Sequence, residues 1–325
     1  MNKNYYEERV NRVLDYVTRN LDGDLSLDKL AQVSHFSPYH FHRIFQGVTG
    51  ETVHGFVRRA RLERAAQLMK AAPVRRITDI ALEAGFPGLA EFSRAFKAHF
   101  GITASSWDRR APLEKSKICK APGDLVLYSL EELEQQKKAL GLRVQIGRLN
   151  RCRYVYFRVF NSYGNERLME AYHSLLNWLA ERQTDLNDVV LIGMSQDDPT
   201  ITPAEKCSYD IGAVFPIDAE DQGIVGDILK SRQRAGRGLL LPNRAECEPL
   251  GLTVRDFEAG TIAVLRCAGD ITVVSYAWQY LFRIWLPASG YKPANLPGFE
   301  IFARTPEEIG WETFDLYGCL PLVKM

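Results

Sequence analysis

Apolar residues recur at three- and four-residue spacing through most of the first 110 residues, which is the period of amphipathic helices. The stripe predicted for residues 5–20 consists of Tyr6, Val10, Val13, Leu14 and Val17. A short helix is predicted to begin after Ser26, which can cap it, and another after Ser37, whose cap is followed by Pro38 at the first helical position. Two short helices joined by a tight turn predict a helix-turn-helix unit.

The second helix of this unit has an apolar side and a polar side. Its apolar stripe consists of Phe41, Ile44, Phe45 and Val48. Four polar side chains are predicted to project from the opposite side: Tyr39, His42, Arg43 and Gln46. Arginine and glutamine can pair with base edges in the major groove, and histidine and tyrosine can reach bases or phosphates. The alternative is a solvated helix face without a partner.

The same unit occurs a second time along the chain. FHRIFQGVTG at 41–50 and FSRAFKAHFG at 92–101 share two phenylalanines, an arginine and the final glycine at an offset of 51. The outward positions of the second copy are Glu91, Arg94 and Lys97. One long helix without internal proline is predicted between the units, with Pro73 marking its end. A stiff helix that fixes the separation of two such units suits successive major-groove faces of duplex DNA.

The segments LSLDKLAQVSHFSPYHFHRIF and IALEAGFPGLAEFSRAFK, with IAxxxGF before FSRxFK, resemble the DNA-binding domain of AraC/XylS-type transcription regulators. The resemblance implies that Tyr39, His42 and Arg43 contact bases. It also implies that the corresponding places in the second unit are held by Ala90, Glu91 and Arg94. Pro87-Gly88 replaces the family's usual Ser or Asp cap, which leaves open whether the second helix contributes phosphate contacts through Arg94 and Lys97 or very little.

From residue 142 the pattern changes to alternating strands around helices, and the chain again repeats itself. Trp178 matches Trp285, and Pro199 matches Pro306, both at an offset of 107. Helices are predicted at about 165–182 and 271–286, so each copy is predicted to be a strand-helix-strand-strand unit. The predicted fold class is therefore multidomain: an all-α double helix-turn-helix domain followed by an α+β domain of two such repeats.

Alternation along the strands predicts which side chains share a face. Val155, Phe157 and Val159 suit the face that packs on the helices, which leaves Tyr156 on the other face. Phe299 and Ile301 are predicted to pack on the helices as well, which places Glu300 and Phe302 with Tyr156. The counterpart of Glu300 at an offset of 107 is Gly193, so only one copy carries the acid.

A single carboxylate in an aromatic groove suits a cationic ligand whose apolar body stacks on the rings. The alternative is a solvated glutamate at a strand end. VLIGMSQDDPTITPAEKCSYDIGAVF and LPGFEIFARTPEEIGWETFDLYGCLPL resemble the two copies of the GyrI-like effector-binding domain. This resemblance implies that Glu300 lies at the floor of a pocket, with Phe302 where the family usually has tyrosine. The candidate pocket walls are Tyr156, Trp278 and Trp311.

The net charge of +1 conceals a division along the chain. Residues 1–110 contain 17 Lys and Arg against 12 Asp and Glu, a net of +5, and the remainder has a net of −4. A basic first part is compatible with a polyanionic partner. The six cysteines show neither CxxC pairs nor zinc-type spacing, and the N-terminus lacks a secretion signal, so a reducing cytoplasm is expected without a metal, cofactor or membrane span.

Together these patterns predict a DNA-binding domain at 1–110, a linker at 111–140 and an effector-binding domain at 141–325. The pattern does not decide whether the polar helix in SLEELEQQKKALG docks on either domain. The predicted function is a transcription regulator, not an enzyme. Its expected partners are double-stranded DNA, RNA polymerase and a small effector that is cationic and also aromatic or amphipathic. Two alternatives remain: a small-molecule hydrolase with Glu300 as general base, and a protein-interaction module that uses the same cleft.

Overall fold

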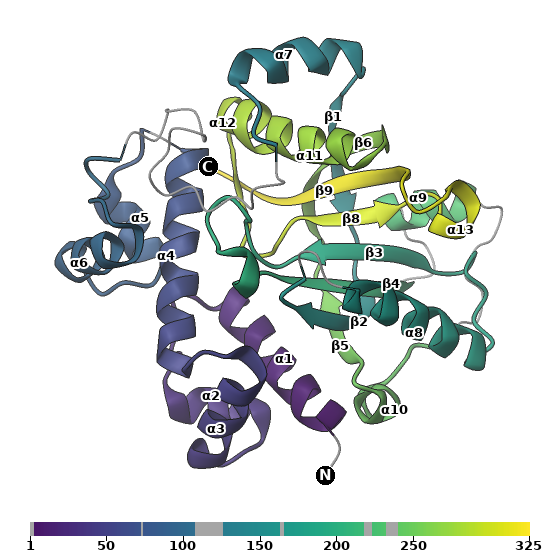
Figure 1. The fold of residues 1–325 in the computed structure, drawn as a ribbon, viewed down its shortest axis with the longest axis horizontal. Helices are drawn as coiled ribbons and strands as arrows, with labels where there is room; N and C mark the ends of the chain where they lie inside the picture. Colours follow the sequence, from purple (N-terminus) through teal and green to yellow (C-terminus); the bar gives the residue numbers. More distant parts are fainter. Residues whose placement is uncertain (1–2, 73, 108–125, 163–165, 218–222, 232–239) are drawn as a thin grey trace.

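The computed structural model describes residues 3–72, 74–107, 126–162, 166–217, 223–231 and 240–325. Helices from the first third of the chain lie beside a curved sheet that carries its own helices (Figure 1). Residues 111–125 of the expected linker lie outside the described residues. Within the described parts of the chain, no helix is both long and apolar enough to cross a membrane.

Six helices form the N-terminal domain: α1 (Lys3–Arg19), α2 (Leu27–Ser34), α3 (Pro38–Thr49), α4 (Val53–Ala71), α5 (Ile77–Glu83) and α6 (Leu89–Phe100). The caps predicted from the sequence are confirmed, because the hydroxyls of Ser26 and Ser37 accept hydrogen bonds from backbone amides of α2 and α3. Such a cap contributes about 1 kcal/mol. The pairs α2–α3 and α5–α6 are the two predicted helix-turn-helix units, and α4 joins them.

Each unit has its own core. The first packs around Phe41 and Phe45 of α3 and includes the apolar stripe of α1. The second packs around Phe92 and Phe96 of α6 and includes the second half of α4. Because α4 contributes to both cores, the two units are held at the ends of one helix (Figure 1).

The described chain contains one antiparallel sheet. Its strands are β1 (Val144–Leu149), β2 (Cys152–Phe160), β3 (Val190–Ser195), β4 (Ser208–Pro216), β5 (Thr253–Phe257), β6 (Gly260–Gly269), β7 (Tyr291–Pro293), β8 (Phe299–Phe302) and β9 (Phe314–Lys324). Their order is β1-β6-β9-β8-β3-β4-β2-β5, and β7 pairs with β9. The order β6-β9-β8 mirrors β2-β4-β3, so the predicted duplication is confirmed: a first repeat of β2-α8-β3-β4 and a second of β6-α11-β8-β9.

The two repeats meet where β3 pairs with β8. Gly193 lies opposite Glu300 in this pairing, and these are the positions that the sequence repeat relates to each other. Gly193 and Glu300 are paired across the antiparallel strands and also occupy equivalent positions in the two repeats. The two-fold axis that relates the repeats therefore passes beside this pair. The asymmetric acid is therefore located at the centre of the sheet.

The helical segments of the C-terminal domain are α7 (Leu130–Ala139), α8 (Arg167–Glu181), η2 (Ala204–Lys206), α9 (Ile224–Ser231), α10 (Arg244–Cys247), η3 (Glu248–Leu250), α11 (Ile271–Tyr280), η4 (Leu281–Trp285), α12 (Leu286–Ala288) and α13 (Pro306–Ile309). The segment η4 is a π-helical turn between α11 and α12, and such turns occur frequently at functional sites. The predicted helices at 165–182 and 271–286 correspond to α8 and to the α11-η4-α12 segment.

The polar helix α7 docks on the C-terminal domain. Leu133 is buried with side chains of α11, and the Tyr276 hydroxyl donates to the backbone oxygen of Glu132 over 2.8 Å. Gln279 and Arg283 bind the backbone of residues 126 and 128 just before the helix. This answers the question that the sequence pattern left open.

The sheet has two covered faces. One packs on α8 and α11 and is called the helix face here. The opposite face carries Tyr154 and Tyr156, and it is covered by α1 of the N-terminal domain and by α9. The expectation that this second face forms an open groove is therefore wrong, because the N-terminal domain occupies it.

Candidate functional site

The polar side of α3 is the first candidate nucleic-acid surface. Tyr39 is 74% exposed, Arg43 and Gln46 are also exposed, and His42 is half-buried. The Arg43 guanidinium lies 5.9 Å from the centroid of the Tyr39 ring. The fold thus places the base-contacting candidates of the first unit on one solvent-facing surface, opposite the buried Phe41 and Phe45.

The second candidate nucleic-acid surface is the polar side of α6, where Glu91, Arg94 and Lys97 are exposed. Gly88 is the N-cap residue and makes no side-chain capping hydrogen bond, as the sequence predicted. The helix nevertheless forms, because Phe92 and Phe96 are fully buried in the core of the unit. Tertiary packing therefore replaces the missing cap.

Glu300 is the centre of the second candidate site. It lies half-buried on β8 and accepts two hydrogen bonds, from the Tyr209 hydroxyl over 2.6 Å and from the Trp278 indole N–H over 2.8 Å. Burial raises the pKa of the Glu300 carboxyl, although both hydrogen bonds favour its ionised form. Both donors are neutral, so neither compensates the charge of the carboxylate.

Glycines make room for the two donors. A Cβ atom at Gly193, opposite Glu300, would collide with the hydroxyl of Tyr209. A Cβ atom at Gly298, just before β8, would lie 2.8 Å from the Trp278 ring. The missing side chains allow Tyr209 and Trp278 to reach the carboxylate from opposite sides of the repeat boundary.

Tyr209 is a candidate residue of this site that the sequence interpretation missed. The signal was available, because its counterpart in the second repeat at an offset of 105 is Phe314. Tyr209 in one copy and Glu300 in the other are both polar departures from the repeat, and the structure joins them by a hydrogen bond.

Three other candidates lie on or near the helix face. Trp278 bonds Glu300 and stacks with Phe282 at a centroid distance of 5.8 Å. Phe302 packs against the side chains beneath both α8 and α11. Trp311 is 45% exposed and packs edge-on against Tyr172 of α8 at 5.4 Å.

Tyr156 lies on the opposite face of the sheet from Glu300. Its hydroxyl donates to Asp15 of α1 over 2.8 Å, and the side chain is fully buried. The prediction that Glu300 and Phe302 share a face with Tyr156 is wrong, because Phe299 and Ile301 pack with Tyr156 instead. Both faces of β8 are covered, so apolar residues at alternate positions did not identify the helix face.

A buried ion network holds α1 on the sheet. Asp15 accepts from Arg158 of β2 and Arg255 of β5, each over 2.9 Å, and Arg158 also pairs with Asp210 of β4 over 2.7 Å. Burial alone would raise the pKa of Asp15, but Arg255 and Arg158 outweigh it and hold that pKa below its ordinary value. The network fixes the N-terminal domain on the first repeat.

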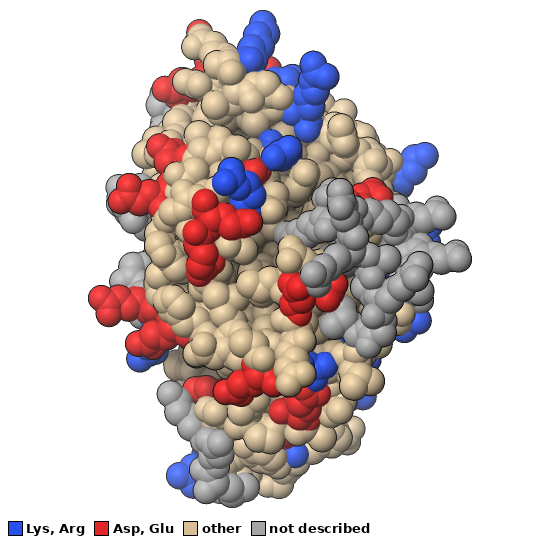
Figure 2. All heavy atoms as spheres, turned by 90° about the vertical axis from the view of Figure 1, so that its right-hand side faces the viewer, with Lys and Arg blue, Asp and Glu red and all other residues tan. Residues whose placement is uncertain are grey.

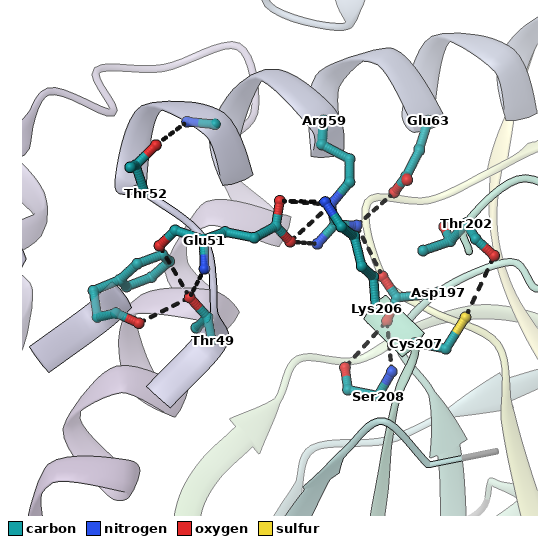
Figure 3. A network of polar contacts seen from close by, with 12 residues as sticks. Thr49, Glu51, Thr52, Arg59, Glu63, Asp197, Thr202, Lys206, Cys207 and Ser208 are labelled. Carbon is teal, nitrogen blue, oxygen red and sulfur yellow. Dashed lines mark hydrogen bonds and ion pairs between the residues drawn. The ribbon is translucent and has the colours of Figure 1, made fainter. Parts of the chain in front are cut away.

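A second network joins α4 to the loop after β3 (Figure 3). The Arg59 guanidinium contacts Glu51 at 2.8 Å, Glu63 at 2.9 Å and Asp197 at 3.5 Å. Burial, together with the nearby charge of Asp197, raises the pKa of Glu63 to about 7 despite the attraction of Arg59. These contacts show that α4 packs against the C-terminal domain as well as within its own domain.

The surface near α8 and α13 is acidic. Figure 2 shows acidic side chains across this face of the molecule, with basic side chains mainly toward its edges. Glu170 of α8 and Glu307 and Glu308 of α13 are among the exposed acids. Such a field favours the approach of cations. Among the residues that the structure describes, no group of three His, Cys, Asp or Glu side chains could hold a metal ion.

The arrangement defines a two-domain class: a double helix-turn-helix domain followed by a duplicated α+β domain with a half-buried acid at its centre. The chain belongs to the GyrI-like family, because residues 142–318 match the family described as GyrI-like small molecule binding domain. Residues 30–110 match the family described as helix-turn-helix domain, and this domain is of the AraC type.

Individual curated proteins match part of the chain. The chain is 38% identical to an uncharacterized HTH-type transcriptional regulator, YbfP of Bacillus subtilis (strain 168), over 32% of this chain and 35% of that protein. It is 36% identical to the right origin-binding protein of Escherichia coli (strain K12) over 31% of this chain and 34% of that protein. The matched regions thus span about a third of the length of these curated relatives.

Two solved structures are similar to parts of the chain. A transcriptional regulator with an AraC-type DNA-binding domain from Chromobacterium violaceum is 26% identical, with a TM-score of 0.28, over 29% of this chain and 84% of that chain. An uncharacterized conserved protein from Listeria innocua is 11% identical, with a TM-score of 0.35, over 58% of this chain and 98% of that chain.

Proposed function

We propose that this chain is a sequence-specific DNA-binding transcription regulator whose C-terminal domain senses a small hydrophobic cation at Glu300. The proposal is supported for the DNA-binding part by the AraC-type domain, by relatives named as transcriptional regulators and by the exposed polar faces of α3 and α6. RNA polymerase is the further partner that transcription regulation requires.

The observation that carries the sensing proposal is the state of Glu300. A half-buried carboxylate with two neutral hydrogen-bond donors has a raised pKa, and a cation bound beside it would supply the missing charge compensation. We place the body of such a ligand against the half-buried rings of Trp278 and Phe302. An inorganic cation would leave this aromatic surface unused, which favours an organic one.

The sensing proposal is tested by binding measurements with tetraphenylphosphonium, a hydrophobic cation, and with neutral triphenylphosphine oxide. Glu300→Gln is expected to weaken binding of the cation by at least about tenfold and to leave the neutral compound nearly unchanged. Isothermal titration calorimetry on the full chain measures both. If Glu300→Gln binds the cation as tightly as the wild type does, Glu300 is not the recognition group.

The DNA-binding proposal is tested by selecting bound sequences from a random duplex pool, with and without the cation. Arg43→Ala is expected to weaken binding to the selected site by about 1–3 kcal/mol more than binding to random DNA, because Arg43 is proposed to contact a base. Arg94→Ala changes the equivalent arginine of the second helix-turn-helix unit and serves as the comparison for Arg43→Ala. Equal losses on selected and random DNA in Arg43→Ala would reduce Arg43 to a phosphate contact.

The hydrolase alternative makes a different prediction from the same carboxyl. A raised pKa also suits a general base, so an enzyme would consume its ligand and lose turnover in Glu300→Gln. A sensor would return the bound cation unchanged after prolonged incubation. Mass spectrometry of the recovered ligand separates the two functions.

A further inference from the structure

A continuous series of contacts leads from Glu300 to the recognition helix of the first unit. The Tyr209 hydroxyl donates to Glu300 over 2.6 Å, and Tyr209 directly follows Ser208 at the start of β4. The backbone N–H and hydroxyl of Ser208 both donate to one carboxylate oxygen of Asp197, over 2.9 and 3.1 Å. The start of β4 thus positions Asp197 on one face of the sheet and Tyr209 on the other.

The series crosses to the N-terminal domain at Arg59 (Figure 3). Asp197 contacts Arg59 at 3.5 Å, and Arg59 donates to both carboxylate oxygens of Glu51 over 2.8 to 3.2 Å. Glu51 lies in the turn between α3 and α4, where its N–H donates to the Thr49 hydroxyl over 3.2 Å. That hydroxyl in turn donates to the backbone oxygen of Phe45 over 2.8 Å, within the last turn of α3. We call the series the relay, and it consists of Tyr209, Ser208, Asp197, Arg59 and Glu51.

The relay is weakest where the domains meet. The contact between Arg59 and Asp197 is the longest of the three ion pairs of Arg59, and the other two partners, Glu51 and Glu63, belong to the N-terminal domain. Arg59 therefore keeps its charge compensated if Asp197 withdraws, which avoids the large cost of an unpaired buried cation.

The interface beside this contact is not tightly packed. A cavity of about 130 Å³ lies there, lined by α4, by Asp197 and its neighbours, and by residues 294–297 that lead into β8. Space of this size holds several water molecules, so small shifts of the loop do not require the domains to repack. The cavity, together with the pairing of Arg59 with Glu51 and Glu63, allows two arrangements of the interface. In one the Arg59–Asp197 contact is made, and in the other it is broken.

We infer that the relay transmits occupancy of the Glu300 site to the end of recognition helix α3; this regulation rests on the proposed sensing function. A cation beside Glu300 competes with the Tyr209 hydroxyl for the carboxylate. Release of Tyr209 shifts the start of β4, and Asp197 withdraws from Arg59. The turn at Glu51 then loses its link to the sheet through Arg59 and loosens. The ligand thereby shifts the balance between the two arrangements of the interface.

Hydrogen–deuterium exchange of the full chain tests the relay without any ligand. Tyr209→Phe and Asp197→Asn are each expected to make the amides of residues 49–56 exchange at least about threefold faster. Phenylalanine already occupies the equivalent position 314 of the second repeat, so Tyr209→Phe suits the fold. Asp198→Asn is the matched control, because Asp198 also crosses the interface, to Lys70 at 3.3 Å, but does not belong to the relay. Its exchange at 49–56 is expected to remain that of the wild type.

A second measurement asks whether the relay carries the ligand signal. Tetraphenylphosphonium is expected to change the Kd of wild-type protein for its selected DNA by about fivefold or more, and that of Asp197→Asn by less than about twofold. Asp197→Asn is expected to retain the affinity of the wild type for the cation.

The outcomes separate the relay from the sensing function. Wild-type exchange at 49–56 in Tyr209→Phe, or an undiminished response in Asp197→Asn, overturns the relay and leaves cation sensing intact. Absence of cation binding to the wild type overturns the proposed function, and the relay then survives only as a mechanical link if the exchange result holds.

Discussion

The two repeats of the C-terminal domain share one scaffold but differ in what covers them. Each contains an Arg–Asp pair between its first and last strands. In the first repeat, Arg158 and Asp210 lie under α1 with side chains 2% and 0% exposed, whereas in the second repeat Arg266 is 59% exposed beside Asp315. The second repeat instead contributes Glu300, where the first has Gly193.

The two repeats have the same fold but are assigned different roles. The first repeat holds the DNA-binding domain through buried charges, and the second carries the acid proposed to meet the ligand. Duplication provides two equivalent sets of positions, which can carry different side chains in the two copies. The two copies are joined at the repeat boundary, where Tyr209 of the first bonds Glu300 of the second.

The largest difference is expected for the two equivalent aspartates. Asp210→Ala leaves Arg158 with one fewer partner in a buried network, and it should lower the free energy of unfolding by about 3–5 kcal/mol. Asp315→Ala removes the partner of an exposed arginine and should cost about 1 kcal/mol or less. Urea denaturation of both full-length variants measures the difference. Equal losses would mean that the covering helix α1 does not set the strength of the pair.

A smaller effect is expected at the repeat boundary. Gly193→Ala should push the Tyr209 hydroxyl away from Glu300 and lower the free energy of unfolding by about 1–3 kcal/mol, because the new Cβ atom has no room. Gly260→Ala is the matched control on β6, where no atom lies within 4 Å of the new Cβ atom. Thermal unfolding of both variants gives the comparison, and a Gly193→Ala variant as stable as Gly260→Ala would show that Tyr209 is free to move aside.

The smallest effect is expected in the pH dependence of stability. The folded protein raises the pKa of Glu300 above its unfolded value, so the related stability is fully present below the unfolded pKa and is lost as pH rises through the folded pKa. Wild-type stability should therefore fall relative to Glu300→Gln as pH rises from the ordinary carboxyl pKa through the raised pKa of the folded protein. Denaturation curves measured across that range test this, and parallel profiles of the two proteins would show that Glu300 ionises freely.

The helical third could be predicted from the sequence because local signals decide it. The serine caps, the phenylalanine stripes of α3 and α6 and the proline-free α4 all act within a few residues. The strand-helix-strand-strand repeats were likewise visible, because tryptophan and proline marks recur at a nearly constant offset.

The face of Glu300 could not be predicted by alternation. Phe299 and Ile301 flank it and are as apolar as a helix-packed face requires, yet they pack with Tyr156 beneath α1 and α9. The sequence contains no local sign that a helix almost three hundred residues away covers that face. The repeat comparison was the better guide, because it identifies Glu300 and also Tyr209 without assigning faces.

The interdomain contacts were hidden for a related reason. Asp15 on α1 and Arg59 and Glu63 on α4 occupy polar helix positions that are typical of solvated faces. The structure shows them buried because a second domain packs there. Only the arrangement of the two domains distinguishes these charges from ordinary surface residues.

The location of Glu300 beside the local two-fold axis has a consequence for the stoichiometry of the proposed cation binding. A second carboxylate at position 193 would face the first directly across two paired strands, where like charges repel and one would stay protonated. The centre of the sheet therefore accommodates one carboxylate, and each chain is expected to bind one cation there. A dose–response curve for a single chain should accordingly follow a simple hyperbola, with any steeper response arising from the association of whole molecules.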